Sequence, residues 1–272
     1  MTATDHRAGR AEDAPVWHAH GHGSPLVLIN GFAASGRMWP RQWLRELERQ
    51  FRVITLDNRG SGFSRYAEAP FSIADMANDV VAVLDEAEVP QACVFGISMG
   101  GMVAQELALR HPDRVVSLII AASRPPNPAF HPPSLRTRWI MVQPAGPSLS
   151  RYFDKLWSYS AAPGFAEAHP EVIAEMTQQS LERPAPRATL LNQSRAMAAW
   201  GHADRLRAIT APTLIVHGTL DPLSPVENGR SLAAEIPGSR YVEWDDVGHL
   251  LPQEAPDRLI ELITEHCSAA LS

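Results

Sequence analysis

The sequence predicts an α/β fold in which a mostly parallel sheet is flanked by helices and carries an inserted helical cap. Short apolar runs rich in β-branched residues alternate with longer segments of helical periodicity over residues 26–121. The alternation stops at a proline-rich stretch that begins at Arg124, and it resumes with two more strand-like runs after residue 212. Because alternating strands and helices are typical of a parallel sheet, we expect one sheet that the insertion interrupts.

The first half of the chain contains four predicted strands, at residues 26–30, 53–57, 92–96 and 115–121. Between the second and third strands, apolar residues of the segment 73–84 recur at helical spacing. Ser72 and Asp75 have the spacing of a capping box at the start of that helix. A further helix follows the third strand, since residues 99, 103 and 107 are apolar, and Pro112 marks its end.

Seven prolines lie within residues 124–147, which indicates a linker or the beginning of a lid. Three helical patches without a convincing strand follow at residues 152–159, 170–181 and 188–200. The alternating pattern then returns as a strand, a helix, a strand and an amphipathic helix, at residues 213–217, 226–235, 240–244 and 256–266. We therefore expect residues 15–123 and 206–272 to form an α/β core, residues 124–205 a helical cap, and residues 1–14 a flexible N-terminus.

Composition excludes several classes of protein and favours a small molecule as the partner. The 272 residues are 45% hydrophobic and 20% charged, which is too apolar for a disordered chain. Two cysteines, Cys93 and Cys267, cannot make a disulfide framework, and a reducing, cytoplasmic compartment suits them. The longest apolar stretch, residues 115–122, is far shorter than the roughly 20 residues of a membrane span. Residues 1–14 lack the apolar region of a signal peptide, and a net charge of −6 argues against nucleic acid. The oligomeric state is left open.

The strongest chemical signal is the G-x-S-x-G motif of residues 96–100, which lies directly between a predicted strand and a predicted helix. A serine on such a turn is held in strained backbone geometry with its hydroxyl exposed, and glycines at both ends let the chain pass closely. The same pattern occurs by chance in glycine-rich turns, but the strand before it and the helix after it favour Ser98 as a nucleophile.

A serine hydroxyl needs a general base, and the base needs an orienting group. Asp221 and His249 each follow a late predicted strand, at the edge where ligands of open α/β sheets gather. Asp221 has an alternative interpretation as the turn residue of an Asp-Pro pair, and Asp245 and Asp246 are weaker candidates for the acid. The order Ser98, Asp221, His249 is the one expected for a triad on an α/β-hydrolase sheet, which favours the catalytic interpretation.

With these motifs the chain resembles the α/β-hydrolase superfamily, close to its small serine esterase, enol-lactonase and cofactor-free haloperoxidase-like branch. The resemblance covers residues 16–123 and 205–266, and the cap matches only by position. It is carried by four segments in family order, GISMG around Ser98, HGTLDPLSP around Asp221, VGHLLPQEAP around His249, and DNRGSGFS at residues 57–64.

The oxyanion hole of this fold uses the backbone N–H of the residue after the nucleophile and an N–H from the loop after an early strand. These donors are expected to be Met99 and Phe32. The family usually has His-Gly where this chain has Asn30-Gly31, and asparagine there resembles the enol-lactonase branch. The role of the Asn30 side chain is left open.

Other polar residues receive structural interpretations. His18, His20 and His22 alternate on one face of a short strand, as metal ligands would, but no carboxylate or cysteine is spaced to complete a site, so we favour a solvated edge strand and no metal. Asp57, Arg59 and Ser64 are interpreted as loop architecture. The cap supplies the aromatic candidates for a substrate pocket, each of which can equally pack cap helices, Trp139, Phe153, Trp157 and Trp200.

We therefore predict a serine hydrolase that cleaves a carboxylic ester or lactone through an acyl-enzyme intermediate, without a cofactor or metal. The same triad also suits C–C bond hydrolysis of a diketone or a haloperoxidase-like perhydrolysis, and the sequence does not separate them. Dehalogenases and epoxide hydrolases on this fold need aspartate in place of Ser98 and are disfavoured. A non-catalytic binding module is a further alternative, which the presence of all three triad residues disfavours.

Overall fold

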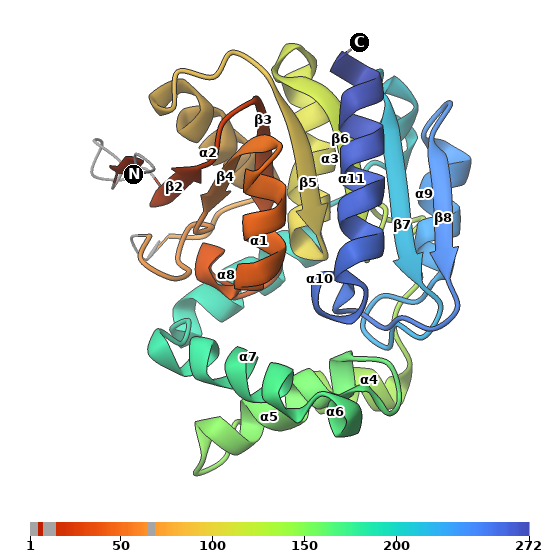
Figure 1. Cartoon of the computed structure of the whole chain (residues 1–272). Coiled ribbons are helices and arrows are strands. Elements are labelled where there is room, and N and C mark those ends of the chain that lie inside the picture. The colour runs from red at the N-terminus through yellow and green to blue at the C-terminus, as the bar shows by residue number, and fades with distance from the viewer. Residues whose placement is uncertain (1–4, 8–14, 65–68, 272) are drawn as a thin grey trace.

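The computed structural model describes residues 5–7, 15–64 and 69–271, and within them one sheet forms the centre of the molecule (Figure 1). Its strand order is β1-β2-β4-β3-β5-β6-β7-β8, with β3 to β8 parallel and with β1 and β2 antiparallel to their neighbours. The strands are β1 (Asp5–Arg7), β2 (Trp17–His20), β3 (Ser24–Ile29), β4 (Phe51–Leu56), β5 (Ala92–Ile97), β6 (Val115–Ala121), β7 (Thr213–Gly218) and β8 (Arg240–Trp244). The predicted mostly parallel sheet is confirmed.

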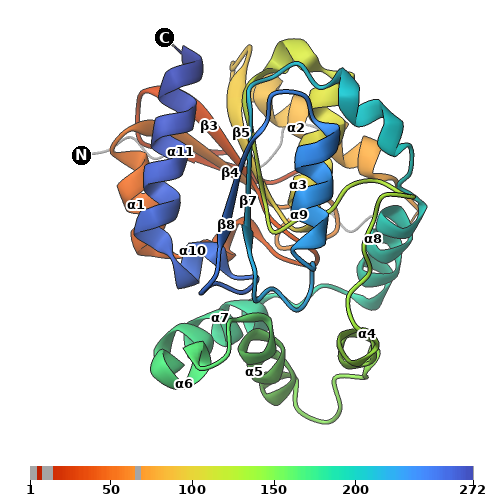
Figure 2. The ribbon, with the colours of Figure 1, turned by 90° about the vertical axis from the view of Figure 1, so that its right-hand side faces the viewer.

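Helices cover both faces of the sheet (Figure 2). One face carries α1 (Arg41–Glu48) and α11 (Pro256–Leu271), and the other carries α2 (Ile73–Glu86), α3 (Met99–Arg110) and α9 (Glu227–Glu235). The capping box predicted for α2 is present, because the Ser72 side chain accepts from the Asp75 backbone N–H and the Asp75 side chain accepts from the Ser72 N–H. These contacts satisfy backbone donors that a helix start leaves unpaired.

Two apolar layers hold the helices to the sheet. Val80 and Val103 belong to the layer under α2 and α3, whereas Trp43, Phe95 and Leu259 belong to the layer under α1 and α11. Burial of each large apolar side chain contributes about 1.5–3 kcal/mol. The sheet is therefore a rigid base for the loops at its carboxyl edge.

The chain between β6 and β7 forms five α-helices, which lie beyond the carboxyl ends of the strands (Figure 1), and a short 3-10 helix, Ala203–Ala208. We call residues 124–205 the helical segment. Its helices are α4 (Leu135–Val142), α5 (Leu149–Ser160), α6 (Phe165–Ala168), α7 (Pro170–Glu182) and α8 (Arg187–Ala199). The sequence did not predict α4, which lies inside the proline-rich stretch. It forms because its eight residues contain no proline, and because Ser134 caps it by accepting from the Thr137 N–H at 3.1 Å.

The amino-terminal part of the sheet departs from expectation. β2 is not an edge strand, since His18 pairs with His6 of β1 on one side and with Thr55 of β4 on the other. The predicted flexible N-terminus lies largely outside the described residues, and residues 5–7 form β1 instead. In the described part of the chain, no helix combines the length and the apolar character needed to cross a membrane.

Candidate active site

Ser98 occupies the turn between β5 and α3 in a strained conformation, with φ of 57° and ψ of −122°. L-residues rarely adopt a positive φ, and such strain is typical of functional positions. The neighbouring glycines allow the turn: a Cβ at Gly96 would lie 2.3 Å from the Gly100 carbonyl oxygen, and a Cβ at Gly100 would lie 2.1 Å from the Ile29 carbonyl oxygen. Close backbone packing, at the end of β3 and within the turn itself, thus dictates both glycines of the motif.

Asp221 and His249 meet in loops that follow β7 and β8. Their side chains are joined by a hydrogen bond of 2.7 Å between His249 Nδ1 and Asp221 Oδ2. The other oxygen of Asp221 accepts from the backbone N–H groups of Leu223 and Ser224, both at 2.8 Å. Because the carboxylate binds Nδ1, the neutral imidazole carries its lone pair on Nε2.

The two groups adjust each other's protonation. Burial raises the pKa of Asp221, but the positive charge of His249 and the hydrogen bonds from His217 and His249 outweigh burial and lower that pKa to about 2. Burial lowers the pKa of His249, but the charge of Asp221, its hydrogen bond and the charge of Glu254 outweigh burial, so that pKa is raised above 6.5. Asp221 is therefore an anion at neutral pH, and it stabilises the imidazolium form of His249.

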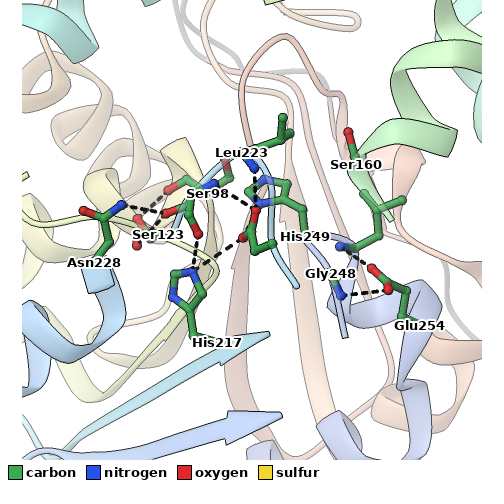
Figure 3. Close-up of polar contacts among 12 residues, drawn as sticks. Ser98, Ser123, Ser160, His217, Leu223, Asn228, Gly248, His249 and Glu254 are labelled. Atoms are coloured by element: carbon green, nitrogen blue, oxygen red, sulfur yellow. Dashed lines mark hydrogen bonds and ion pairs between the residues drawn. The ribbon is translucent and has the colours of Figure 1, made fainter. Parts of the chain in front are cut away.

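A second buried histidine, His217 at the end of β7, contacts the same loop (Figure 3). Its Nε2 lies 2.7 Å from the Ser224 carbonyl oxygen and 3.5 Å from Asp221 Oδ2. A carbonyl only accepts, so Nε2 carries the proton and donates it. His217 thereby fixes the loop that presents Asp221. The sequence patterns did not mark this residue as functional, although it begins the HGTLDPLSP segment.

Glu254 on α10 (Leu251–Glu254), a second residue that the sequence patterns did not mark, joins the histidine loop to the helical segment. Its carboxylate accepts from the backbone N–H groups of Gly248, Leu250 and Ala162, each at 2.8 Å. The His249 N–H donates to the Ser160 carbonyl oxygen at 2.9 Å, which adds a second connection. Burial raises the pKa of Glu254, against the lowering effect of the three N–H donors. The only sequence signal for this residue is its place near the end of the VGHLLPQEAP segment.

The loop after β3 carries Phe32, and the side chain of Asn30 folds it. Asn30 Oδ1 accepts from the Gly31 N–H at 2.8 Å, and Asn30 Nδ2 donates to the Ser35 carbonyl oxygen at 3.0 Å. Gln193 of α8 reaches this loop from the helical segment, because its Oε1 accepts from the Ala33 N–H at 2.8 Å. The question that the sequence left about Asn30 therefore has a structural answer: its amide shapes the loop.

One cavity of about 520 Å³ adjoins Ser98, Met99, Phe32 and His249, and most of its lining is apolar. It lies between the carboxyl edge of the sheet and the helical segment. Of the four aromatic pocket candidates, Trp157 lines it.

The other three candidates do not line this cavity. Trp139 is 66% exposed on α4, and Phe153 packs edge-on against Tyr152. Trp200 is buried, and its Nε1 donates to Glu106 at 3.0 Å. Helix periodicity indicates the spacing of these aromatic residues. It does not indicate which face of the helical segment packs on the core, so it could not select the residue that lines the cavity.

The remaining polar motifs have structural roles. Asp57 accepts from the Gly36 and Phe63 N–H groups at 2.6 and 2.7 Å, and Arg59 pairs with Asp79 at 2.6 Å. These contacts match their interpretation as loop architecture. Over residues 5–7, 15–64 and 69–271, no three His, Cys, Asp or Glu side chains group as metal ligands would.

Comparison with known proteins places this fold and site in a family. The family model for the alpha/beta hydrolase fold matches residues 24–256. A protein of Azorhizobium caulinodans, provisionally named carbamate hydrolase RutD, is 30% identical over 256 residues, which cover 94% of this chain and 96% of that protein. The 3-oxoadipate enol-lactonase 2 of Acinetobacter baylyi is 28% identical over 235 residues, which cover 85% and 84%. The solved structure of a thermophilic esterase from Thermogutta terrifontis matches with a TM-score of 0.81 and 28% identity, over 100% of both chains.

The chain belongs to the α/β-hydrolase family, and it is an enzyme of the hydrolase class. The resemblance that the four sequence motifs carry is thus confirmed.

Proposed function

We propose that this enzyme is a serine hydrolase that cleaves a carboxylic ester or lactone through an acyl-enzyme intermediate. Ser98 is the nucleophile, His249 the general base and Asp221 the orienting acid. The observation that carries the proposal is the 2.7 Å hydrogen bond between His249 and Asp221, beside a cavity that His249 shares with the strained turn of Ser98.

The first half-reaction forms the acyl-enzyme. Asp221 holds the Nδ1 proton of His249, so Nε2 takes the proton of Ser98 Oγ as the oxygen attacks the substrate carbonyl. Negative charge develops on the carbonyl oxygen, and the backbone N–H groups of Met99 and Phe32 stabilise it. One such donor is worth about 2.7–4 kcal/mol in other serine hydrolases. His249 then protonates the leaving alkoxide as the tetrahedral intermediate breaks down.

The second half-reaction releases the acid. His249 is neutral again, and it takes a proton from a water molecule that attacks the acyl carbon. Ser98 leaves with the proton returned from His249, which restores the starting state. Every proton passes through Nε2, and no further group is needed.

The substrate class rests on the cavity and on the relatives. An apolar cavity of about 520 Å³ suits an ester or lactone of moderate size. The names of the enol-lactonase and esterase relatives support the same bond types. We further propose that residues 15–123 and 206–272 act as the catalytic core and residues 124–205 as its cap.

A fluorophosphonate probe tests the nucleophile. We expect the wild-type enzyme to be labelled and to hydrolyse aryl esters or lactones, and Ser98→Ala to lose both properties. Ester turnover that survives in a folded Ser98→Ala protein would remove Ser98 from the chemistry. Intact-protein mass spectrometry shows whether one label is added.

The acid and the bond type are tested with a further variant and a substrate panel. Asp221→Asn is expected to lower kcat by about 10³–10⁴-fold, because asparagine does not stabilise the productive tautomer and charge of His249. The panel contains aryl esters, lactones, a C–C diketone and an aryl carbamate, the last because one relative carries that name. Turnover of the diketone or carbamate alone would contradict ester and lactone cleavage.

A further inference from the structure

Among the described residues that line the cavity, those with a permanent charge are all positive. Arg124, at the start of the helical segment, and Arg138, on α4, both line it. No aspartate or glutamate is among the described residues that line it. This is unexpected in a chain whose net charge is −6, since acidic residues outnumber basic ones overall.

Arg124 is partly buried, and its side chain contacts carbonyl oxygens and aromatic rings. Its guanidinium donates to the carbonyl oxygens of Pro125, at 2.9 Å, and Met197. It also lies over the rings of Phe130 and Trp200, at 4.2 and 5.6 Å from their centroids. Among the residues that the structure describes, no carboxylate pairs with it. Burial lowers the pKa of Arg124 to about 10, so it keeps its positive charge at neutral pH.

Three other arginines that approach the core are paired with acids. Arg59 pairs with Asp79, and both Arg110 and Arg205 pair with the buried Glu106. Placing a cation in a partly buried site without a carboxylate costs free energy, which a negatively charged ligand recovers. Arg124 uses two of the five donors of a guanidinium on carbonyl oxygens and retains donors for a ligand.

We infer that Arg124 and Arg138 bind a carboxylate on the substrate, so that the enzyme prefers an ester or lactone that carries a second, free carboxylate. The inference rests on the proposed function for the reacting bond, and it specifies the substrate class.

The chemistry of the two residues fits a carboxylate. The planar guanidinium fork matches two carboxylate oxygens, and the largely apolar cavity strengthens the attraction. The apolar walls accommodate the hydrocarbon between that carboxylate and the reacting carbonyl. The absence of acidic groups from the described lining means that nothing there repels the anion.

The preference is measured with two esters of equal chain length, p-nitrophenyl pentanoate and mono-p-nitrophenyl glutarate. They differ by the free carboxylate at the far end of the acyl chain. We expect kcat/KM of the wild-type enzyme to be about tenfold or more higher for the glutarate ester, as charge-assisted hydrogen bonds imply. Equal values, or a preference for pentanoate, would overturn the inference.

Two variants assign the preference to the arginines. Arg138→Gln and Arg124→Gln are each expected to reduce the ratio of kcat/KM between the two esters by about 5- to 50-fold, mainly through KM. Arg136→Gln is the matched control, because Arg136 is exposed on the same helix and does not line the cavity; its ratio is expected to equal that of the wild type. Arg138 is exposed, so Arg138→Gln folds even if Arg124→Gln does not. An unchanged ratio in Arg138→Gln and in folded Arg124→Gln would overturn the assignment.

A binding measurement separates this inference from the proposed function. In the Ser98→Ala background, calorimetry is expected to show tighter binding of monomethyl glutarate than of methyl pentanoate, and Arg138→Gln is expected to remove the difference. If that difference is found but no ester is turned over by the wild-type enzyme, the proposed function is wrong and the carboxylate site stands. If both esters are hydrolysed and the difference is absent, the proposed function stands and the carboxylate site is wrong.

Discussion

His249 has two partners that act on its charge, and the balance between them and burial determines the pH at which it would be available as the proposed general base. Asp221 and Glu254 both favour the protonated ring, whereas burial opposes it. The pKa of His249 is raised above 6.5 as a result. A protonated imidazole has no lone pair for the proton of Ser98.

The activity should therefore decrease when the pH falls below the pKa of His249. Below the raised pKa of His249 the base is blocked, so kcat/KM is expected to fall as the pH decreases, with a midpoint above 6.5. Asp221 stays ionised through this range because its pKa is lowered to about 2. A pH profile of ester hydrolysis measures the midpoint, and a midpoint well below 6.5 would contradict the assignment of His249 as the base.

The close packing of the G-x-S-x-G motif leads to a prediction about stability. A Cβ at Gly100 would lie 2.1 Å from the Ile29 carbonyl oxygen, so Gly100→Ala must displace the end of β3. We expect a loss of about 1–3 kcal/mol or more in the free energy of unfolding, measured in urea. Gly201→Ala is the control, because the atoms nearest to a Cβ at Gly201 would be 3.9 and 4.0 Å away, and it should change stability by less than about 0.5 kcal/mol. Equal stabilities for the two variants would refute the close approach.

At the scale of elements, the four-residue helix α10 connects two parts of the site. It places Glu254 where one carboxylate pairs with backbone donors of the histidine loop and of the helical segment. No single neutral acceptor replaces it, because both oxygens are used: one accepts from Gly248 and Ala162, and the other accepts from Leu250.

Glu254→Gln is expected to lower kcat/KM by about tenfold, since the loss of one charge-assisted hydrogen bond costs roughly 1.5–3 kcal/mol and His249 loses its fixed position. The midpoint of the pH profile should also move down, because the charge of Glu254 contributes to the raised pKa of His249. Glu261→Gln, at an exposed position of α11, is the control and should alter neither property. A lowered activity with an unmoved pH midpoint would contradict the effect of the Glu254 charge on His249 and leave Glu254 only its hydrogen bonds to the loop.

The sequence predicted the strands and helices with the strongest hydrophobic pattern. It did not predict features that depend on contacts with residues distant in the chain. β5, β6 and β7 are wholly or almost wholly buried, so their continuous apolar runs were visible. The helix α4 was hidden, because seven surrounding prolines dominate the composition while the eight helical residues contain none. β2 was expected at an edge, because pairing with residues 5–7 leaves no mark on its own side-chain pattern.

At the scale of the whole molecule, one sheet brings together groups that are distant in the chain. Ser98 follows β5, and Asp221 and His249 follow β7 and β8 on the same carboxyl edge. The order of motifs made these three residues predictable as candidates. His217, Glu254 and Gln193 were not, since each acts on a backbone group of another loop or element, and backbone groups have no sequence signature.

The helical segment is fastened to both of the loops that would perform the chemistry. Gln193 holds the loop of Phe32 through Ala33, while Ser160 and Ala162 bind the histidine loop directly or through Glu254. Lifting the segment as a rigid body would break all of these hydrogen bonds together. Each loop would then keep only the contacts it makes within the core, those of the Asn30 amide in one and of the Glu254 carboxylate in the other, so the seated segment adds a second support to both.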